Sequence, residues 1–243
     1  MKSILLLLAA GVMAVADADG NTPLHRAAIK GDVRLARSLL DRGARADAAN
    51  KRGQTPLHLL AGQAVARRAQ AELMNCLLDH GAPVDARDMM NETPLHLAAA
   101  RKHAGLVKLL LDRGAKAEAA DDNGMTPLMW AAAGDEQGGI VTMLLAHGAQ
   151  ADAANANGQT PLHLAAANGR DRAAEALLAH GARWDAPDRR GATPLSHCCG
   201  KTAPVLLAHG ADPSSLPASL RAQLAKSAET GECEVAPRPK ARP

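Results

Sequence analysis

The sequence predicts an all-α protein built as a solenoid, a stack of about six helix-turn-helix repeats. The tetrapeptide Thr-Pro-Leu-His occurs four times, and Thr-Pro-Leu-Met and Thr-Pro-Leu-Ser keep its spacing. The steps between successive starts are 33, 38, 33, 34 and 33 residues, and a period of this length marks a repeat architecture. A glycine 12 residues before each later motif is a second landmark. The six motifs start at Thr22, Thr55, Thr93, Thr126, Thr160 and Thr193.

Each motif supplies the start of a helix. Thr is a favoured N-cap because its hydroxyl accepts a backbone N–H that has no other partner at a helix start. Pro is tolerated at the first helical position, where its fixed φ angle suits the helix. Leu then opens the apolar stripe. We therefore expect a first helix to begin just after each motif Thr.

The recurring glycines mark the end of a second helix in each repeat. Each one follows a Leu-rich run, and a glycine in that position is typical of a helix C-cap. Asp, Asn and Gly clusters follow at residues 121–124, 155–158 and 188–191, and they suit tight turns with positive φ. Each repeat is thus predicted to be two helices and a β-turn, here called the finger. The glycines are Gly43, Gly81, Gly114, Gly148 and Gly181.

The motif, the glycine and the period resemble the ankyrin repeat, over almost the whole chain. More closely, the chain resembles an exported ankyrin protein of bacterial type. The resemblance implies that the motif His binds neighbouring backbone and the Thr hydroxyl. It also implies stacking, because one repeat alone cannot bury its apolar face. A protein partner is then expected on the concave face, formed by finger tips and first helices.

The repeat register divides the chain into four segments. They are a leader at residues 1–16, a repeat domain at 17–212, a C-terminal capping segment at 213–228 and a Pro-rich basic tail at 229–243. The repeats are expected at about residues 17–49, 50–87, 88–120, 121–154, 155–187 and 188–212.

Three repeats differ in length from the others. Repeat two is five residues longer, and we place the excess between its two helices, at residues 62–70, with Arg67 and Arg68 projecting. Repeat four has one extra residue near Gly138 and Gly139. Repeat six is four residues short, so we expect it to end the stack.

The leader has two interpretations. A basic start, a 13-residue apolar run at residues 4–16 and an Ala-x-Ala site form the pattern of a secretory signal peptide. The run is too short to span a membrane. The alternative is a half repeat, because residues 5–11 resemble a second helix with its glycine, although Gly11 lies 11 residues before Thr22 rather than 12. The first interpretation places the protein in the periplasm or outside the cell, and the second in the cytoplasm.

Composition argues against several classes of function. The net charge is only +3 and no long basic stripe or zinc-finger spacing occurs, which disfavours nucleic-acid binding. The chain has no Phe or Tyr and two Trp, which an Ala- and Leu-rich solenoid tolerates. Eight of the ten histidines occupy repeat positions, four in the motif and four just before a helix-capping Gly, where a cation is favoured. We therefore expect no catalytic residues, no bound metal and no cofactor.

The four cysteines bear on the compartment. Cys76 is expected to be a small buried hydrophobe. Cys198 and Cys199 lie in the short repeat six and Cys233 in the tail. A disulfide from this pair, such as Cys199 to Cys233, would pin the tail in an oxidising compartment, although connectivity does not follow from sequence. A metal site made from His197 and these cysteines is the less favoured alternative, because adjacent cysteines are not a usual zinc spacing.

The variable finger positions are the expected partner contacts. Two adjacent methionines in finger three suit an adaptable binding surface; the alternative is ordinary variation of surface residues. Trp130, directly after the fourth motif, is the expected anchor, because Trp is enriched among binding hot spots; the alternative is a partly buried packing residue. Trp184 is expected to pack internally. The expected contacts are Lys51, Arg52, Met89, Met90, Glu92, Asp122, Met125, Trp130, Arg189 and Arg190.

These observations favour a monomeric, non-enzymatic module that binds a protein partner. One alternative keeps the fold but makes the protein an intracellular or host-delivered regulator. The other is an accessory or metal-handling subunit of an enzyme, built around His197 and the cysteine pair. Fold alone does not name the partner.

Overall fold

The computed structural model describes residues 16–63, 67–198, 202–215, 218 and 221–222. Within these residues every regular element is a helix, which confirms the predicted all-α fold. The chain groups into two compact units, residues 1–127 and 128–243.

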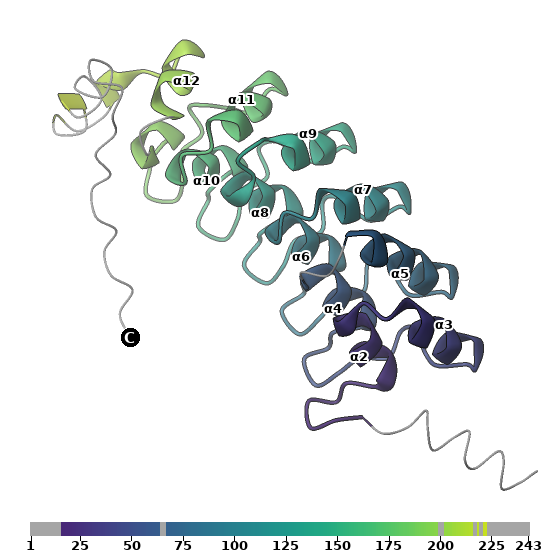
Figure 1. Ribbon diagram of the computed structural model, residues 1–243. Coiled ribbons are helices and arrows are strands. Elements are labelled where there is room, and N and C mark those ends of the chain that lie inside the picture. Colours follow the sequence, from purple (N-terminus) through teal and green to yellow (C-terminus); the bar gives the residue numbers. More distant parts are fainter. Residues whose placement is uncertain (1–15, 64–66, 199–201, 216–217, 219–220, 223–243) are drawn as a thin grey trace, which may run out of the picture. The chain divides into compact units, whose positions relative to one another are not determined.

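Paired helices make up the described part of the first unit. Helices α2, α4 and α6 pack in one row, and α3, α5 and α7 pack in a second row (Figure 1). Each first helix also packs against the second helix of its own repeat. The bounds are α2 Pro23–Lys30, α3 Val33–Asp41, α4 Pro56–Gly62, α5 Arg67–Asp79, α6 Pro94–Ala100 and α7 Ala104–Asp112.

The second unit continues the pattern and ends in shorter elements. Helix α11 packs against α9, α10 and α12, and η1 packs against α10. The bounds are α8 Pro127–Gly134, α9 Gly139–Ala146, α10 Pro161–Ala167, α11 Asp171–Ala179, η1 Pro194–His197, α12 Thr202–Ala208 and η2 Pro213–Ser215.

The helices begin and end where the motifs predict. In α2, Thr22 is the N-cap, its Oγ1 accepts the N–H of His25, and Pro23 is the first residue. The second helix α3 ends at Asp41 with Arg42 as its C-cap, and Gly43 follows with a φ of +87°, a conformation that glycine adopts without strain. The N–H groups of Gly43 and Ala44 bind Leu40 O and Leu39 O at 2.8 and 3.0 Å, as in a Schellman cap.

The core is made of Leu and Ala rather than aromatic side chains. Paired alanines on the first helices, such as Ala27 and Ala28 on α2 and Ala98 and Ala99 on α6, are wholly buried. Small side chains on the first helices leave room for the leucines of neighbouring helices. Cys76 is also buried, as expected.

The extra residues of repeat two do not all lie in a loop, so that prediction was partly wrong. Helix α5 starts at Arg67 and has 13 residues, whereas α3 and α7 have nine. Gln70 is buried in its first turn and donates from Nε2 to Gln63 O at 2.7 Å. The insertion therefore lengthens the second helix, and this hydrogen bond joins the longer helix to the end of α4.

Other length differences appear as predicted. In repeat four Gly138 has a φ of +71° and a Cβ there would meet Arg172 O at 2.9 Å, so only glycine fits. In repeat six the first helix is reduced to the single 3-10 turn η1. Residues 1–15, most of the capping segment and the tail at 229–243 lie outside the described residues, so the predictions for them are not tested.

Candidate binding surface

The first residue of every finger is Asp or Asn, and its side chain closes the turn. In finger three, Asp88 Oδ1 accepts the N–H groups of Met90 and Glu92 at 2.9 and 3.0 Å. The other five fingers repeat this geometry, so the turn is held by a side chain as well as by its own backbone. The six residues are Asp17, Asn50, Asp88, Asp121, Asn155 and Asp188.

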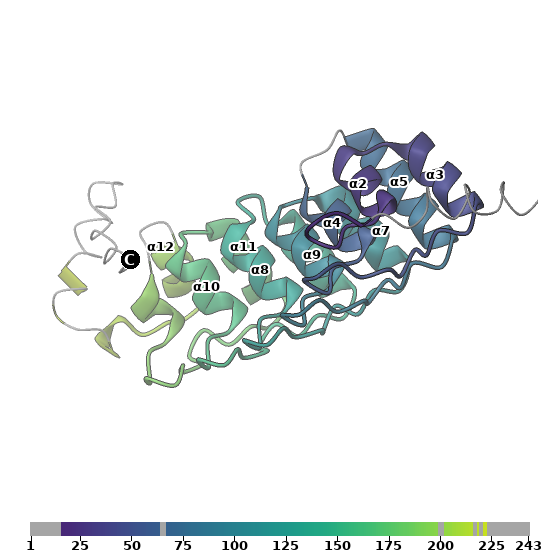
Figure 2. The same cartoon turned by 90° about the horizontal axis from the view of Figure 1, so that it is seen from below.

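Neighbouring fingers in the first unit are joined through their backbones. The N–H of Lys51 binds Asp19 O at 3.0 Å, that of Met89 binds Arg52 O at 2.9 Å, and that of Asp122 binds Met90 O at 3.1 Å. The fingers appear as loops beside the row of α2, α4 and α6 in Figure 1 and lie side by side in Figure 2. Their tips are therefore fixed relative to one another.

Four motif histidines each bind the finger of the following repeat. His58 Nδ1 accepts the N–H of Thr55 at 3.1 Å, and its Nε2 donates to Glu92 O of finger three at 3.0 Å. His25, His96 and His163 make the same pair of bonds. Burial, the main cause, lowers the pKa of all four histidines below 6.5. These side chains are neutral structural ties, as the resemblance implies.

The histidines before the capping glycines bind their own helices. Nδ1 of His80 donates to Cys76 O, four residues earlier, at 2.8 Å. The same bond is made by His147, His180 and His209. The sequence predicted a favoured cation at the helix end, and the structure shows a hydrogen bond from the ring to a terminal carbonyl.

The predicted contact residues of fingers two to four point into solvent. We call the exposed tips of these fingers the tip row. Met89 is 71% exposed and Met90 is 55% exposed, which is unusual for large hydrophobic side chains. Asn91 adopts a φ of +59°, so finger three keeps its turn without glycine, as predicted. The tip row consists of Lys51, Arg52, Met89, Met90, Asp122 and Asn123.

Glu92 and Met125 lie lower, at the last positions of fingers three and four, and both are half-buried. Burial, together with the carboxylates of Asp88 and Asp121, raises the pKa of Glu92. The two residues therefore lie beneath the tip row rather than in it.

Trp130 belongs to the second unit, on α8, and is half-buried. Its Nε1–H is buried and has no hydrogen-bond partner among the described residues. An unpaired buried donor costs about 1–3 kcal/mol, but this nitrogen is buried and is therefore not presented to a partner. Met129, which takes the place of the motif His, is wholly buried and is not available to a partner.

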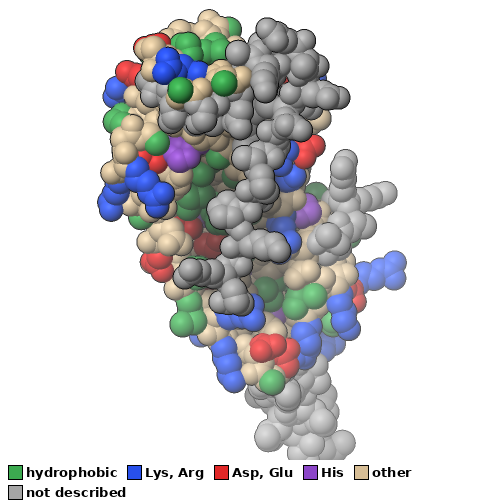
Figure 3. All heavy atoms as spheres, turned by 90° about the vertical axis from the view of Figure 1, so that its left-hand side faces the viewer, with side chains coloured by type: hydrophobic (Ala, Val, Ile, Leu, Met, Phe, Trp, Pro, Cys, Tyr) green, Lys and Arg blue, Asp and Glu red, His purple; other side chains and the backbone are tan. Residues whose placement is uncertain are grey.

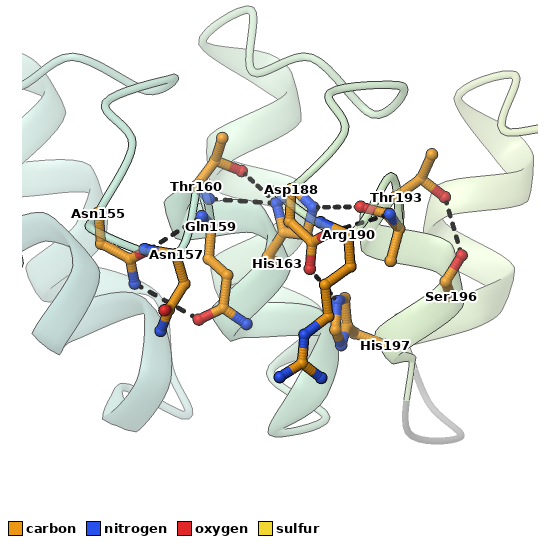
Figure 4. Close-up of polar contacts among 11 residues, drawn as sticks. Asn155, Asn157, Gln159, Thr160, His163, Asp188, Arg190, Thr193, Ser196 and His197 are labelled. Atoms are coloured by element: carbon orange, nitrogen blue, oxygen red, sulfur yellow. Dashed lines mark hydrogen bonds and ion pairs between the residues drawn. The ribbon is translucent and has the colours of Figure 1, made fainter.

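Arg189 and Arg190 are exposed at the tip of finger six. Below them, Asp188 Oδ2 accepts from His197 Nε2 at 3.0 Å, and the ring of His197 lies edge-on to that of His163 (Figure 4). Burial would raise the pKa of Asp188, but the N–H of Ala192, the His197 side chain and the N–H of Arg190 lower it to about 2.

His197 therefore takes over a structural role in repeat six. Ser196 stands in the motif His position and has only a 3.3 Å contact with Thr193 Oγ1. His197, one residue later, instead binds Asp188 in the finger of its own repeat. The ring of Trp184 packs near Gly210, because a Cβ on that glycine would lie 3.9 Å from the ring. This contact agrees with the predicted packing role of Trp184.

The cysteine and metal hypotheses rest partly on residues that are not described. Cys198 Sγ lies 2.9 Å from Thr202 Oγ1. Cys199 and Cys233 lie outside the described residues, so their disulfide is not tested. Among the described residues no group of three or more His, Cys, Asp or Glu side chains is placed to hold a metal ion.

Charges are mixed over the surface. The face seen in Figure 3 carries Lys and Arg side chains in several separate places, with acidic and hydrophobic side chains between them. None of the described helices has the length and apolar character needed to cross a membrane.

The role of the first finger residue was missed by sequence reasoning. The Asp and Asn clusters were assigned to turns with positive φ, yet only the first member has an acceptor that receives two N–H groups. An Asp or Asn five residues before every motif Thr was the available signal.

A family model for ankyrin repeats in three copies matches the chain over residues 2–88, 61–154 and 135–216. No curated protein matches the chain.

Proposed function

Since the chain belongs to the ankyrin repeat family, whose members generally mediate protein–protein interaction, we propose that it is a non-enzymatic module that binds a protein partner through its finger tips and first helices. The observation that carries the proposal is Met89 and Met90, two exposed hydrophobic side chains on a finger whose backbone is held at both sides. Exposed apolar surface on an otherwise polar edge marks interaction sites.

The first helix α8 of the second unit supplies a separate proposed contact. Trp130 is half-buried, so part of its side chain remains open to a partner, and Trp is enriched among binding hot spots. We assign Glu92 and Met125 a supporting role beneath the tips, and Arg189 and Arg190 a separate contact on finger six. The protein itself is proposed to be a monomer without a cofactor.

Quantitative affinity enrichment from native extract tests this function. Wild-type protein is compared with Met89→Ser/Met90→Ser and with Trp130→Ala. Arg37→Ser/Glu175→Ser is the control, because both residues are exposed on second helices. A specific partner should be depleted with the first two variants and retained with the control. Equal recovery with all four proteins would contradict the proposed surface.

For the compartment, we propose export with removal of residues 1–16. Residues 4–16 include no charged or polar side chain, whereas a terminal repeat needs a polar outer face. The first finger is complete from Asp17 onward, with its side chain bound to the N–H groups of Asp19 and Asn21. Export is thus compatible with a complete first repeat.

The cytoplasmic alternative has its own support. The family match begins at residue 2. Leu35 on α3 is 43% exposed, whereas Leu73 and Leu106, at the same place in α5 and α7, are 0% and 3% exposed, so a preceding half repeat would have apolar surface to cover. Mass spectrometry of the mature protein separates the two, because an N-terminus at Met1 would overturn export.

A further inference from the structure

We propose that the tip row recognises a contiguous segment of a partner protein in which acidic side chains lie next to an apolar side chain. This inference rests on the proposed function and adds the chemistry of the partner. It depends on three observations: a rigid row, an apolar centre, and charges of opposite sign on its two sides.

The row is rigid because its members are joined directly. One backbone hydrogen bond links fingers two and three, from Met89 N–H to Arg52 O, and another links fingers three and four, from Asp122 N–H to Met90 O. Asn91 Nδ2 also donates to Asp122 Oδ1. A Cβ on Gly53 would meet Met89 N at 2.9 Å, so fingers two and three are in close contact. A bound segment therefore meets a preformed surface, which reduces the entropy lost on binding.

The centre of the row is apolar. Met89 and Met90 are the most exposed large hydrophobic residues of the described chain. Methionine is flexible and polarisable, so the pair can adapt to aliphatic or aromatic side chains of different shape. An apolar residue of the partner would remove both side chains from water.

The charges of the row are ordered. Lys51 and Arg52 lie on the finger-two side of the methionines, and neither has an ion-pair partner among the described residues. Asp122 lies on the opposite side, in finger four. An acidic group of the partner would therefore be placed next to finger two, with Arg52 offering a fork that suits a carboxylate.

The same order favours a protein segment over nucleic acid. Asp19 in finger one and Asp122 in finger four are exposed on either side of the basic pair, and both would repel a phosphate backbone that continued along the row. The side chains of Met89 and Met90 also have no hydrogen-bond donor for a phosphate group. The basic pair is thus suited to one or two carboxylates next to an apolar side chain.

Selection from a displayed library of random 12-residue peptides tests the inference. Wild-type protein should enrich peptides with Asp or Glu next to Leu, Ile, Met or Phe. Lys51→Glu/Arg52→Glu should enrich Lys or Arg in place of the acidic residues. Arg34→Glu/Arg37→Glu is the matched control, since it reverses two exposed basic residues on α3 that lie outside the proposed surface, and it should keep the wild-type preference.

A second measurement uses wild-type protein alone. A selected peptide is synthesised with its acidic residues and again with Lys in their place, and the exchange should weaken binding by about tenfold or more. Absence of any enriched motif, equal binding of the two peptides, or the same motif from the charge-reversed variant would overturn the inference. If extract still yields a partner that depends on Trp130, the proposed function stands and only the tip row loses its assigned specificity.

Discussion

Lys102 has left-handed backbone, which is rare for a residue with a side chain. Its φ is +61°, and it lies in the turn between α6 and α7. Gly31 and Gly169 hold the same turn in repeats one and five, with φ of +68° and +64°. An L-residue loses about 1 kcal/mol in this conformation, so repeat three has a local cost that repeats one and five avoid.

Lys102→Gly should therefore leave the stability unchanged or increase it by up to about 1 kcal/mol. Arg101→Gly is the control, since Arg101 has a right-handed φ of −87° and glycine there should cost about 0.5–1 kcal/mol. Urea denaturation of both variants measures the difference. Equal losses for the two substitutions would show that the backbone of Lys102 is not strained.

The motif histidines predict a pH dependence of stability. Their pKa values in the folded protein lie below 6.5, so the unfolded chain binds more protons between those values and 6.5. The free energy of unfolding should be constant above about pH 7 and should fall as the pH drops through 6.5. His25→Gln should flatten this slope, whereas His209→Gln, which removes an exposed histidine outside the motif, should not. Stability that rose on acidification to pH 5.5 would contradict the assignment of neutral rings.

At the scale of the elements, the conformation of each finger depends on a few single residues. Glycine is favoured at its fourth position for two reasons that can be separated. Gly53 and Gly191 have φ of +74° and +75°, but a Cβ on Gly53 would meet Met89 N at 2.9 Å, whereas one on Gly191 would meet nothing within 4 Å. A side chain at position 53 would therefore meet both an unfavourable backbone conformation and a steric clash. A side chain at position 191 would meet only the unfavourable conformation.

Gly191→Ala should cost about 1 kcal/mol of stability, and Gly53→Ala should cost more, because finger three must move. Amide hydrogen exchange at Met89 should also accelerate in Gly53→Ala alone, since the bond from Met89 to Arg52 would be lost. Equal stability losses and unchanged exchange at Met89 would show that the fingers do not pack as described.

Repeat six is joined to its finger by Asp188 and His197. Asp188→Asn keeps the turn, because Asn50 and Asn155 close other fingers, but it removes the charge that faces His197. In a double-mutant cycle with His197→Gln, we expect a coupling of roughly 1–3 kcal/mol at pH 6. Because the pKa of Asp188 is about 2, the part due to its charge should vanish only as the pH falls below 3.8 towards 2. A coupling near zero at pH 6 would contradict the pair.

At the scale of the whole molecule, the repeat period predicted the fold because helix starts, helix ends and turns recur at fixed positions. The start of α5 at Arg67 was not predictable, since an insertion that continues a helix and one that forms a loop have similar composition. The exposure of Met89 and Met90 followed from the register, whereas the unpaired N–H of Trp130 depends on packing that no local pattern records.

Site-specific photo-crosslinking tests most directly the claim that this protein binds its partner through the finger tips. A benzophenone side chain is placed at Met90 in one protein and at Arg37, exposed on α3, in another, and both are irradiated in native extract. The account predicts a covalent adduct with the same partner that affinity enrichment recovers, formed from position 90 and absent from position 37. An adduct from position 37 with none from position 90 would contradict it.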